Sequence, residues 1–265
     1  MEAVEALLFD VFGTVVDWRS SVEQELCVLK HRFSLDPTDW EREFAQEWRN
    51  GYMETTRNVA AGASGASNVD KMHREILDRM LDAPNSRWGT VGRVLDEAER
   101  QSLNNVWHRW PDSTEGLHAL KKQIIISTLS NGNVRLLVDM AKHADLPWDM
   151  VFSTELFNTY KPLVLIPITF YDHLSLPFRN PKAYLGAAHH LSLPPEKCAM
   201  VAAHIGDLRA AAAVGMKTIY IPRPGEDNKD VANAVKSKHD GGEVDIVASS
   251  LVELSSILSG LRNQL

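Results

Sequence analysis

Short apolar runs alternate with segments of helical periodicity beyond residue 110, and a similar run lies near the start of the chain; this pattern constrains the fold most strongly. Short apolar runs bounded by turn residues are typical of strands buried on both faces of a sheet. The runs are 4–9, 123–131, 150–154, 198–207 and 217–222, with a last short strand predicted shortly before a closing helix. Strands that alternate with helices predict an α/β fold with a doubly wound, Rossmann-like parallel sheet.

Residues 18–110 interrupt this alternation with helical patterns alone. The stretch "WEREFAQEWRNGYMETTRNV" places four aromatic residues four positions apart, which gives one aromatic stripe on a helix; they are Trp40, Phe44, Trp48 and Tyr52. A length of 265 residues accommodates a core domain with a smaller insert. We therefore predict a Rossmann-like catalytic core from 1–17 and 111–265, and a helical cap, 18–110, inserted after the first strand.

The composition narrows the classes of partner. The net charge is −7, which argues against a nucleic-acid-binding surface, so an anionic substrate would need a local positive pocket. No apolar run approaches the ~20 residues that a membrane span requires. The start of the chain lacks a basic segment followed by an apolar one, so we expect a cytoplasmic protein. Cys27 and Cys198 are expected to be reduced thiols, since two cysteines make neither a disulfide framework nor a metal cluster.

Polar side chains follow successive predicted strands. In doubly wound sheets ligands bind beyond the carboxyl ends of the strands, so residues at these ends are expected to share one site. Any one of them alone could be a helix cap or a surface charge. Together they supply two carboxylates, a cation and hydrogen-bonding groups: Asp10, Ser130, Asn131, Lys161, His204 and Asp207.

Four motifs in this order resemble the haloacid dehalogenase superfamily, and within it the L-2-haloacid dehalogenase (type II) branch. They are "FDVFGT" (9–14), "TLSNG" (128–132), "YKP" (160–162) and "AAHIGDLRAAAAVG" (202–215). The resemblance implies that Asp10 attacks C2 of a short 2-haloalkanoic acid and forms an ester, which water then hydrolyses. It also implies that no metal or cofactor is needed, and that the protein forms a homodimer.

The resemblance also implies roles for the other site residues. Thr14 and Ser130 would hold the nucleophile and the substrate carboxylate, and Asn131 would face the halide. Lys161 would neutralise the carboxylates, and Asp207 would orient it together with the hydrolytic water. The remaining matches are an active-site tyrosine, Tyr184, and a substrate-binding arginine in the segment "EWRNGYM", Arg49. A solvated arginine on a helix face is the structural alternative for Arg49.

Phe12 helps to distinguish a dehalogenase from a phosphatase. Phosphatases of the superfamily carry a second Asp at this position, which protonates a leaving alcohol, whereas a halide leaves without a proton. An aromatic side chain would also line an apolar pocket, in which an anionic nucleophile is less solvated; simple packing below the cap is the alternative. A Mg²⁺-dependent phosphatase-like hydrolase remains the alternative function.

His204 stands where the bacterial family members have an asparagine. It could donate a hydrogen bond or act on water, and a structural role is the alternative.

Residues 163–179 depart from the family pattern, because Lys161-Pro162 is followed by "LVLIPITFYDHLSLPFR". Without these 17 residues Tyr184 falls six positions after Lys161, as the family pattern requires. One hypothesis is a retained intron translated in frame, since 17 × 3 gives 51 nucleotides. The other is a lid or an oligomer contact, because exposed apolar segments often mark binding surfaces. Displacement of Lys161 and Tyr184 by the insertion would make the protein a catalytically impaired member.

Overall fold

The computed structural model describes residues 4–36, 38–60, 68–105, 107–161 and 181–262, so the insertion 163–179 lies outside the described residues. The chain divides into two compact units, one of residues 1–15 and 109–265 and one of residues 16–108. Each junction falls two residues before the boundary predicted from the sequence.

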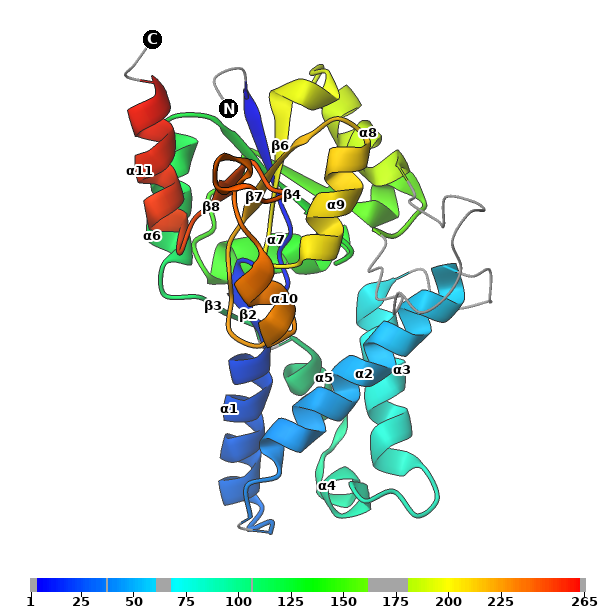
Figure 1. Ribbon diagram of the computed structural model, residues 1–265. Coiled ribbons are helices and arrows are strands. Elements are labelled where there is room, and N and C mark those ends of the chain that lie inside the picture. Colours follow the sequence, from blue (N-terminus) through cyan, green and yellow to red (C-terminus); the bar gives the residue numbers. More distant parts are fainter. Residues whose placement is uncertain (1–3, 37, 61–67, 106, 162–180, 263–265) are drawn as a thin grey trace, which may run out of the picture. The chain divides into compact units, whose positions relative to one another are not determined.

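The larger unit is built on a parallel sheet (Figure 1), which has six strands in the order β5-β4-β1-β6-β7-β8. Its strands are β1 (Ala6–Phe9), β4 (Ile125–Ser130), β5 (Met150–Ser153), β6 (Cys198–Ala202), β7 (Lys217–Tyr220) and β8 (Ile246–Val247). The chain moves outward from β1 in one direction through β4 and β5, then in the other through β6, β7 and β8. The predicted α/β doubly wound fold is confirmed, and the order reverses beside β1, where such sheets bind ligands.

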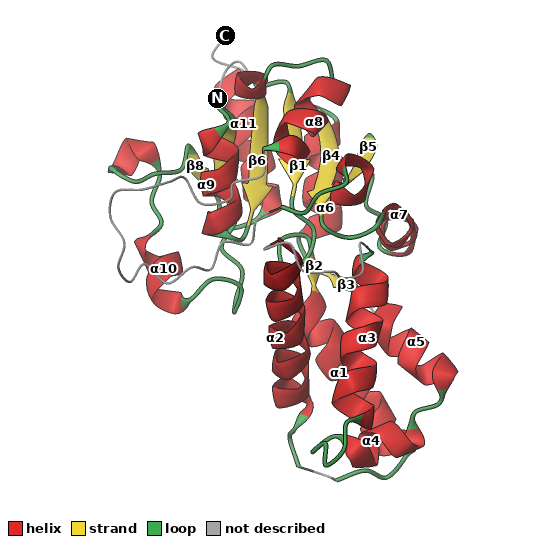
Figure 2. Cartoon of the chain, turned by 90° about the vertical axis from the view of Figure 1, so that its right-hand side faces the viewer, coloured by secondary structure: helices red, strands yellow, loops and turns green. Residues whose placement is uncertain are grey.

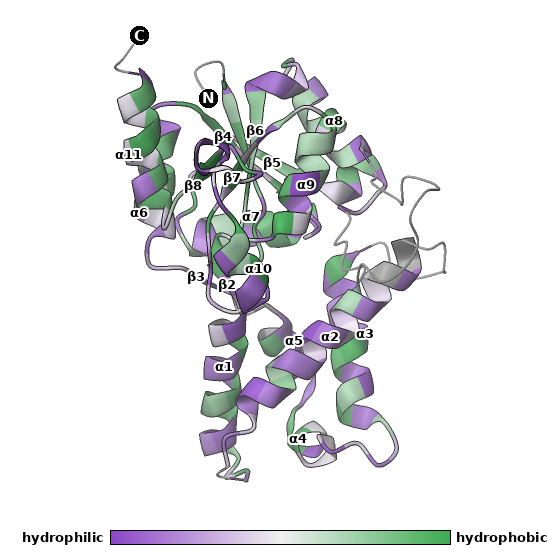
Figure 3. Cartoon of the chain, in the orientation of Figure 1, coloured by the Kyte–Doolittle hydropathy of each residue, from purple (hydrophilic) through white to green (hydrophobic). Residues whose placement is uncertain are grey.

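Helices cover both faces of this sheet (Figure 2). They are α6 (Ser113–Lys121), α7 (Val134–His143), α8 (Lys182–His190), α9 (Ile205–Ala213) and α11 (Leu251–Arg262), with short 3₁₀ turns at Thr154–Phe157, Pro195–Lys197 and Lys238–Asp240. The short helix α10 (Lys229–Ala234) has no buried residue and lies away from the strands in Figure 2. Successive residues of β1 enter opposite cores: Leu7 packs in the cluster that contains α6 and α11, and Leu8 in the cluster that contains α8 and α9. Burial on both faces explains why the first strand is apolar without alternation. In Figure 3 the central strands are accordingly mostly green, whereas the helices carry both colours.

The smaller unit is helical and has an aromatic core. Its helices are α1 (Trp18–Arg32), α2 (Glu41–Ala60), α3 (Val69–Asp82), α4 (Gly89–Val94) and α5 (Glu97–Asn105), and the short strands β2 (Val16–Asp17) and β3 (His108–Arg109) pair at the chain junctions. Phe44, Trp48 and Tyr52 of the predicted stripe are buried. The Trp48 indole N–H donates to the His73 carbonyl at 3.0 Å, so the stripe forms the interior of this unit.

One predicted boundary was wrong, that of the strand over 198–207. The first helix begins at Trp18, where the Asp17 carboxylate caps it by accepting the Ser20 N–H at 3.0 Å. The strand predicted over 198–207 ends at Ala202, and α9 begins at Ile205. The reason is that the Ala203 N–H leaves the ladder and donates to the Thr14 hydroxyl at 2.9 Å. Consequently Asp207 lies in the first turn of a helix, not at a strand end.

No helix among the described residues is both long enough and apolar enough to cross a membrane.

Candidate active site

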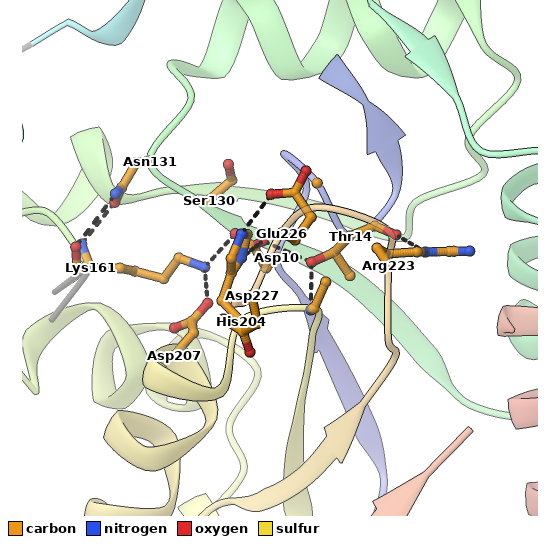
Figure 4. Close-up of polar contacts among 12 residues, drawn as sticks. Asp10, Thr14, Ser130, Asn131, Lys161, His204, Asp207, Arg223, Glu226 and Asp227 are labelled. Atoms are coloured by element: carbon orange, nitrogen blue, oxygen red, sulfur yellow. Dashed lines mark hydrogen bonds and ion pairs between the residues drawn. The ribbon is translucent and has the colours of Figure 1, made fainter. Parts of the chain in front are cut away.

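Asp10 follows β1 and is the centre of a buried polar cluster (Figure 4). Its N–H donates to the Val201 carbonyl at 3.0 Å, which fixes the backbone against β6. The carboxylate accepts hydrogen bonds through both oxygens: Oδ1 from Lys161 Nζ at 2.8 Å and Oδ2 from Thr14 Oγ1 at 2.8 Å. Burial would raise the pKa of Asp10, but the charges of Lys161 and His204 bring it well below its ordinary value. The residue, only 8% exposed, is therefore an ionised carboxylate.

Lys161 bridges the two carboxylates of the cluster, since its Nζ lies 2.8 Å from Asp10 Oδ1 and 2.5 Å from Asp207 Oδ2. Its backbone is held by Asn131, whose Oδ1 accepts the Lys161 N–H at 2.7 Å and the Thr154 hydroxyl at 3.1 Å. Burial would lower the pKa of Lys161, but the two carboxylates raise it. The ammonium thus neutralises carboxylates that would otherwise repel each other.

Asp207 has a second buried partner, because the Tyr184 hydroxyl donates to its Oδ1. Burial and the charge of Asp10 raise the pKa of Asp207, although Lys161 opposes them. Burial and the neighbouring Asp207 also raise the pKa of Tyr184 well above its ordinary value. Lys161 and Tyr184 stand on opposite sides of the insertion, and both contact Asp207.

His204 lies between two carboxylates. Its Nδ1 is 3.2 Å from Asp10 Oδ2, and its Nε2 is 2.9 Å from Glu226 Oε2. Burial would lower the pKa of His204, but the hydrogen bonds and charges of these two carboxylates raise it to about 10. The ring is therefore charged at neutral pH.

The loop after β7 supplies residues that the sequence interpretation missed. Glu226 binds His204, and Asp227 Oδ2 accepts the Ile205 N–H at 2.9 Å, at the start of α9. Arg223 Nε donates to the Thr14 carbonyl at 3.0 Å, while its guanidinium also pairs with Asp112 at 2.7 Å. The sequence contained an indication of this loop, because "PRPGED" begins at the end of the strand predicted at 217–222. Ligands bind beyond the carboxyl ends of strands in such sheets, so its polar residues were candidates for the site.

Other predicted residues have contacts outside the carboxylate cluster. The Ser130 hydroxyl accepts the Gly132 N–H at 3.2 Å. The Phe12 ring packs against the same loop, because a Cβ added to Gly132 would lie 2.8 Å from it. Arg49 belongs to the helical unit, where its guanidinium lies over the rings of Trp18 and Tyr52, 5.1 and 5.3 Å from their centroids.

The cluster does not fit the Mg²⁺ site that a phosphatase would need. Asp10 and Asp207 share the Lys161 ammonium, and His204 bears a positive charge beside them. Within the described ranges, no three His, Cys, Asp or Glu side chains gather as ligands of one metal ion. Mg²⁺ prefers carboxylate and phosphate oxygens with several waters, not a position already taken by a cation.

Comparison with known proteins identifies the family. Residues 4–215 match the model of the haloacid dehalogenase-like hydrolases. The chain belongs to this family. The solved structure of the L-2-haloacid dehalogenase PA0810 is 35% identical, with a TM-score of 0.78, over 97% of this chain and 99% of that one. The defluorinating L-2-haloacid dehalogenase Rha0230 is also 35% identical, with a TM-score of 0.78, over 97% of this chain and 95% of that one.

More distant relatives agree with this assignment. (S)-2-haloacid dehalogenase 1 of Pseudomonas sp. (strain CBS-3) is 24% identical over 230 residues, which cover 84% of this chain and 86% of that protein. The family predicted from the four motifs is thus confirmed, and the branch that they resemble is the one to which these relatives belong.

Proposed function

We propose that this haloacid dehalogenase-like hydrolase removes the halogen from short 2-haloalkanoic acids through an ester of Asp10. The observation that carries the proposal is the state of Asp10: a buried, ionised carboxylate beside Lys161, with the aromatic Phe12 where a phosphatase needs an acid. The names of the relatives, which include (S)-2-haloacid and L-2-haloacid dehalogenases, support the same substrate class.

In the first step, one oxygen of Asp10 attacks C2 from the side opposite the halogen, so the configuration at C2 inverts. The carbon–halogen bond breaks and halide leaves with the electron pair, without a proton. We assign binding of the substrate carboxylate and of the halide to Arg49, Ser130 and Asn131. An arginine suits this role because its planar fork grips a carboxylate in two places.

In the second step, water attacks the carbonyl carbon of the Asp10 ester and loses a proton to Asp207, whose raised pKa suits it as a base. The bond between that carbon and the ester oxygen breaks. The departing 2-hydroxy acid takes a proton from Lys161, which recovers one from Asp207. Asp10 is left as a carboxylic acid and releases its proton to solvent.

Halide and phosphate release, each measured with and without a chelator, separate this proposal from the phosphatase alternative. We expect wild type to release chloride from 2-chloropropionate regardless of chelator, and Asp10→Asn to lose at least ~10³-fold in kcat, as removal of a nucleophile does. Chelator-sensitive phosphate release, or full activity of Asp10→Asn, would refute the proposal. Absence of any turnover by folded wild type would support the catalytically impaired alternative instead.

A further inference from the structure

We propose that Glu226 keeps His204 protonated and that this imidazolium, together with the Thr14 hydroxyl, binds the oxyanion formed on Asp10 during ester hydrolysis. The inference rests on the proposed aspartyl ester and adds two assignments to it. His204 is a catalytic residue for the second step, and Glu226 is the residue that positions and charges it.

The hydrogen bonds of the His204 ring define its protonation. Each ring nitrogen lies within 3.2 Å of an oxygen of a carboxylate, Nδ1 at Asp10 and Nε2 at Glu226. An ionised carboxylate only accepts hydrogen bonds, so both ring nitrogens must carry a hydrogen. The Glu226 side chain is 3% exposed, and its charge is therefore poorly screened from the ring.

The Thr14 hydroxyl also donates to Asp10 Oδ2. Its hydroxyl oxygen accepts the Ala203 N–H at 2.9 Å and lies 2.8 Å from Asp10 Oδ2. Since the first contact uses the oxygen as an acceptor, the hydroxyl hydrogen is directed at Oδ2. Two donors, one of them charged, thus converge on Oδ2, whereas Lys161 lies at Oδ1.

The positions of these donors indicate which oxygen of Asp10 attacks C2 and which becomes the carbonyl oxygen of the ester. We assign Oδ1 as the oxygen that attacks C2, because in the second step it leaves with the product, next to the Lys161 ammonium. Oδ2 is then the carbonyl oxygen of the ester. When water attacks the ester carbon, the π electrons of the carbonyl bond move to Oδ2. Oδ2 then carries a negative charge between Thr14 and His204 until the bond from this carbon to Oδ1 breaks. Donors placed where charge develops stabilise the transition state more than the ground state.

Glu226 matters most in the intermediate. In the part of the chain that the structure describes, two carboxylates pair with His204 in the free enzyme: Asp10, from the loop after β1, and Glu226, from the loop after β7. Alkylation removes the charge of Asp10, and Lys161 then lies near a neutral ester. Among the described residues, Glu226 is then the carboxylate that still contacts the imidazolium and keeps it charged while water attacks.

The test compares Glu226→Gln with wild type by rapid mixing with 2-chloropropionate between pH 6 and 10. We expect Glu226→Gln to retain an initial burst of about one chloride per active site, because alkylation does not need the oxyanion site. Ester hydrolysis in this variant should slow by ~10²-fold at pH 9, the loss typical of one oxyanion donor. Because only the protonated ring is active, the alkaline decline in kcat should move toward neutral pH.

His204→Asn supplies a neutral donor at the same place and separates positioning from general structure. It should hydrolyse the ester more slowly than wild type, without the alkaline decline, and adding Glu226→Gln to it should cause no further loss. Glu243→Gln is the matched control: Glu243 pairs with Arg209 at 2.7 Å, and the side chain is 46% exposed. This variant should keep the wild-type pH profile.

The outcomes distinguish the two proposals. If wild type forms no ester on Asp10, the proposed function itself fails. If it does, the oxyanion assignment is overturned by a Glu226→Gln enzyme that loses the burst or by one with wild-type ester hydrolysis and pH profile. Equal effects of Glu226→Gln in the wild-type enzyme and in the His204→Asn variant would overturn it as well.

Discussion

At the scale of single residues, the site depends on Lys161, whose ammonium is the buried charge shared by Asp10 and Asp207. We expect Lys161→Met to lower kcat by ~10³-fold, because it removes an electrostatic partner of both the nucleophile and the leaving oxygen. Without the ammonium the pKa of Asp10 rises, so the acidic decline in kcat/KM should move to higher pH. The pH dependence of chloride release measures both effects.

Lys197→Met is the control for Lys161→Met, since Lys197 forms an exposed ion pair with Glu5. It should leave activity and pH profile unchanged. An unshifted acidic decline in Lys161→Met would show that the ammonium does not set the charge of Asp10.

His204 should also make stability depend on pH. Its pKa is raised from 6.5 to about 10 in the folded chain, so its contribution is complete below pH 6.5 and is lost as pH rises through about 10. The free energy of unfolding of wild type should therefore decrease relative to His204→Asn across this range. The slope should be at most ~1.4 kcal/mol per pH unit for one proton. Urea titrations at several pH values measure it, and a constant difference between the two proteins would contradict a charged His204.

At the scale of elements, the loops at the carboxyl ends of the strands build the site. The Asp10 and Lys161 positions were predictable from the sequence because each follows an apolar strand in a family motif. Glu226 was missed although it follows a predicted strand, because the loop after β7 carries no motif of the family and the strand-end rule does not say which partner a carboxylate there contacts. The end of β6 was also missed, since "AMVAA" continues apolar past Ala202, the last strand residue, to Ala203, which leaves the sheet.

A substitution at Gly13 tests the contact between the loop after β1 and the loop after β7. This glycine has a φ of +83°, which side chains disfavour, and a Cβ added there would collide with the Glu226 carboxylate. We expect Gly13→Ala to lower the free energy of unfolding by ~1–3 kcal/mol through backbone strain. It should also slow ester hydrolysis by displacing Glu226. Thermal unfolding and the chloride burst assay measure the two effects.

Gly260→Ala is the matched control for Gly13→Ala, because Gly260 lies in α11 and an added Cβ meets nothing within 4 Å. It should stabilise by ~0.5–1 kcal/mol, as replacement of a helical glycine by alanine does. Equal effects of the two substitutions would contradict the strain at Gly13.

At the scale of the whole molecule, the α/β fold could be predicted because strands buried on both faces have unmistakable sequences. The helical unit could be recognised because its aromatic stripe has a period of four, although the role of Arg49 could not be deduced from charge: other arginines share α2. The function of Arg49 as a substrate ligand stays a prediction from family resemblance, as does the homodimer.

Arg49→Leu tests whether the helical unit contributes to substrate binding. A charge-assisted hydrogen bond contributes ~1.5–3 kcal/mol, so KM for 2-chloropropionate should rise ~10- to 100-fold. Arg42→Leu, on the same helix and exposed, should leave KM unchanged. Steady-state kinetics measure KM for both variants. Equal KM values would show that Arg49 does not bind the substrate.

The covalent role of Asp10 is the central claim, and one turnover in ¹⁸O-labelled water with enzyme in excess tests it most directly. The product oxygen then comes from the Asp10 carboxylate, and the label enters the enzyme. Mass spectrometry should therefore find unlabelled 2-hydroxy acid and ¹⁸O in the peptide that contains Asp10. Labelled 2-hydroxy acid in this first turnover would mean that water attacks C2 itself, and would contradict the aspartyl-ester mechanism.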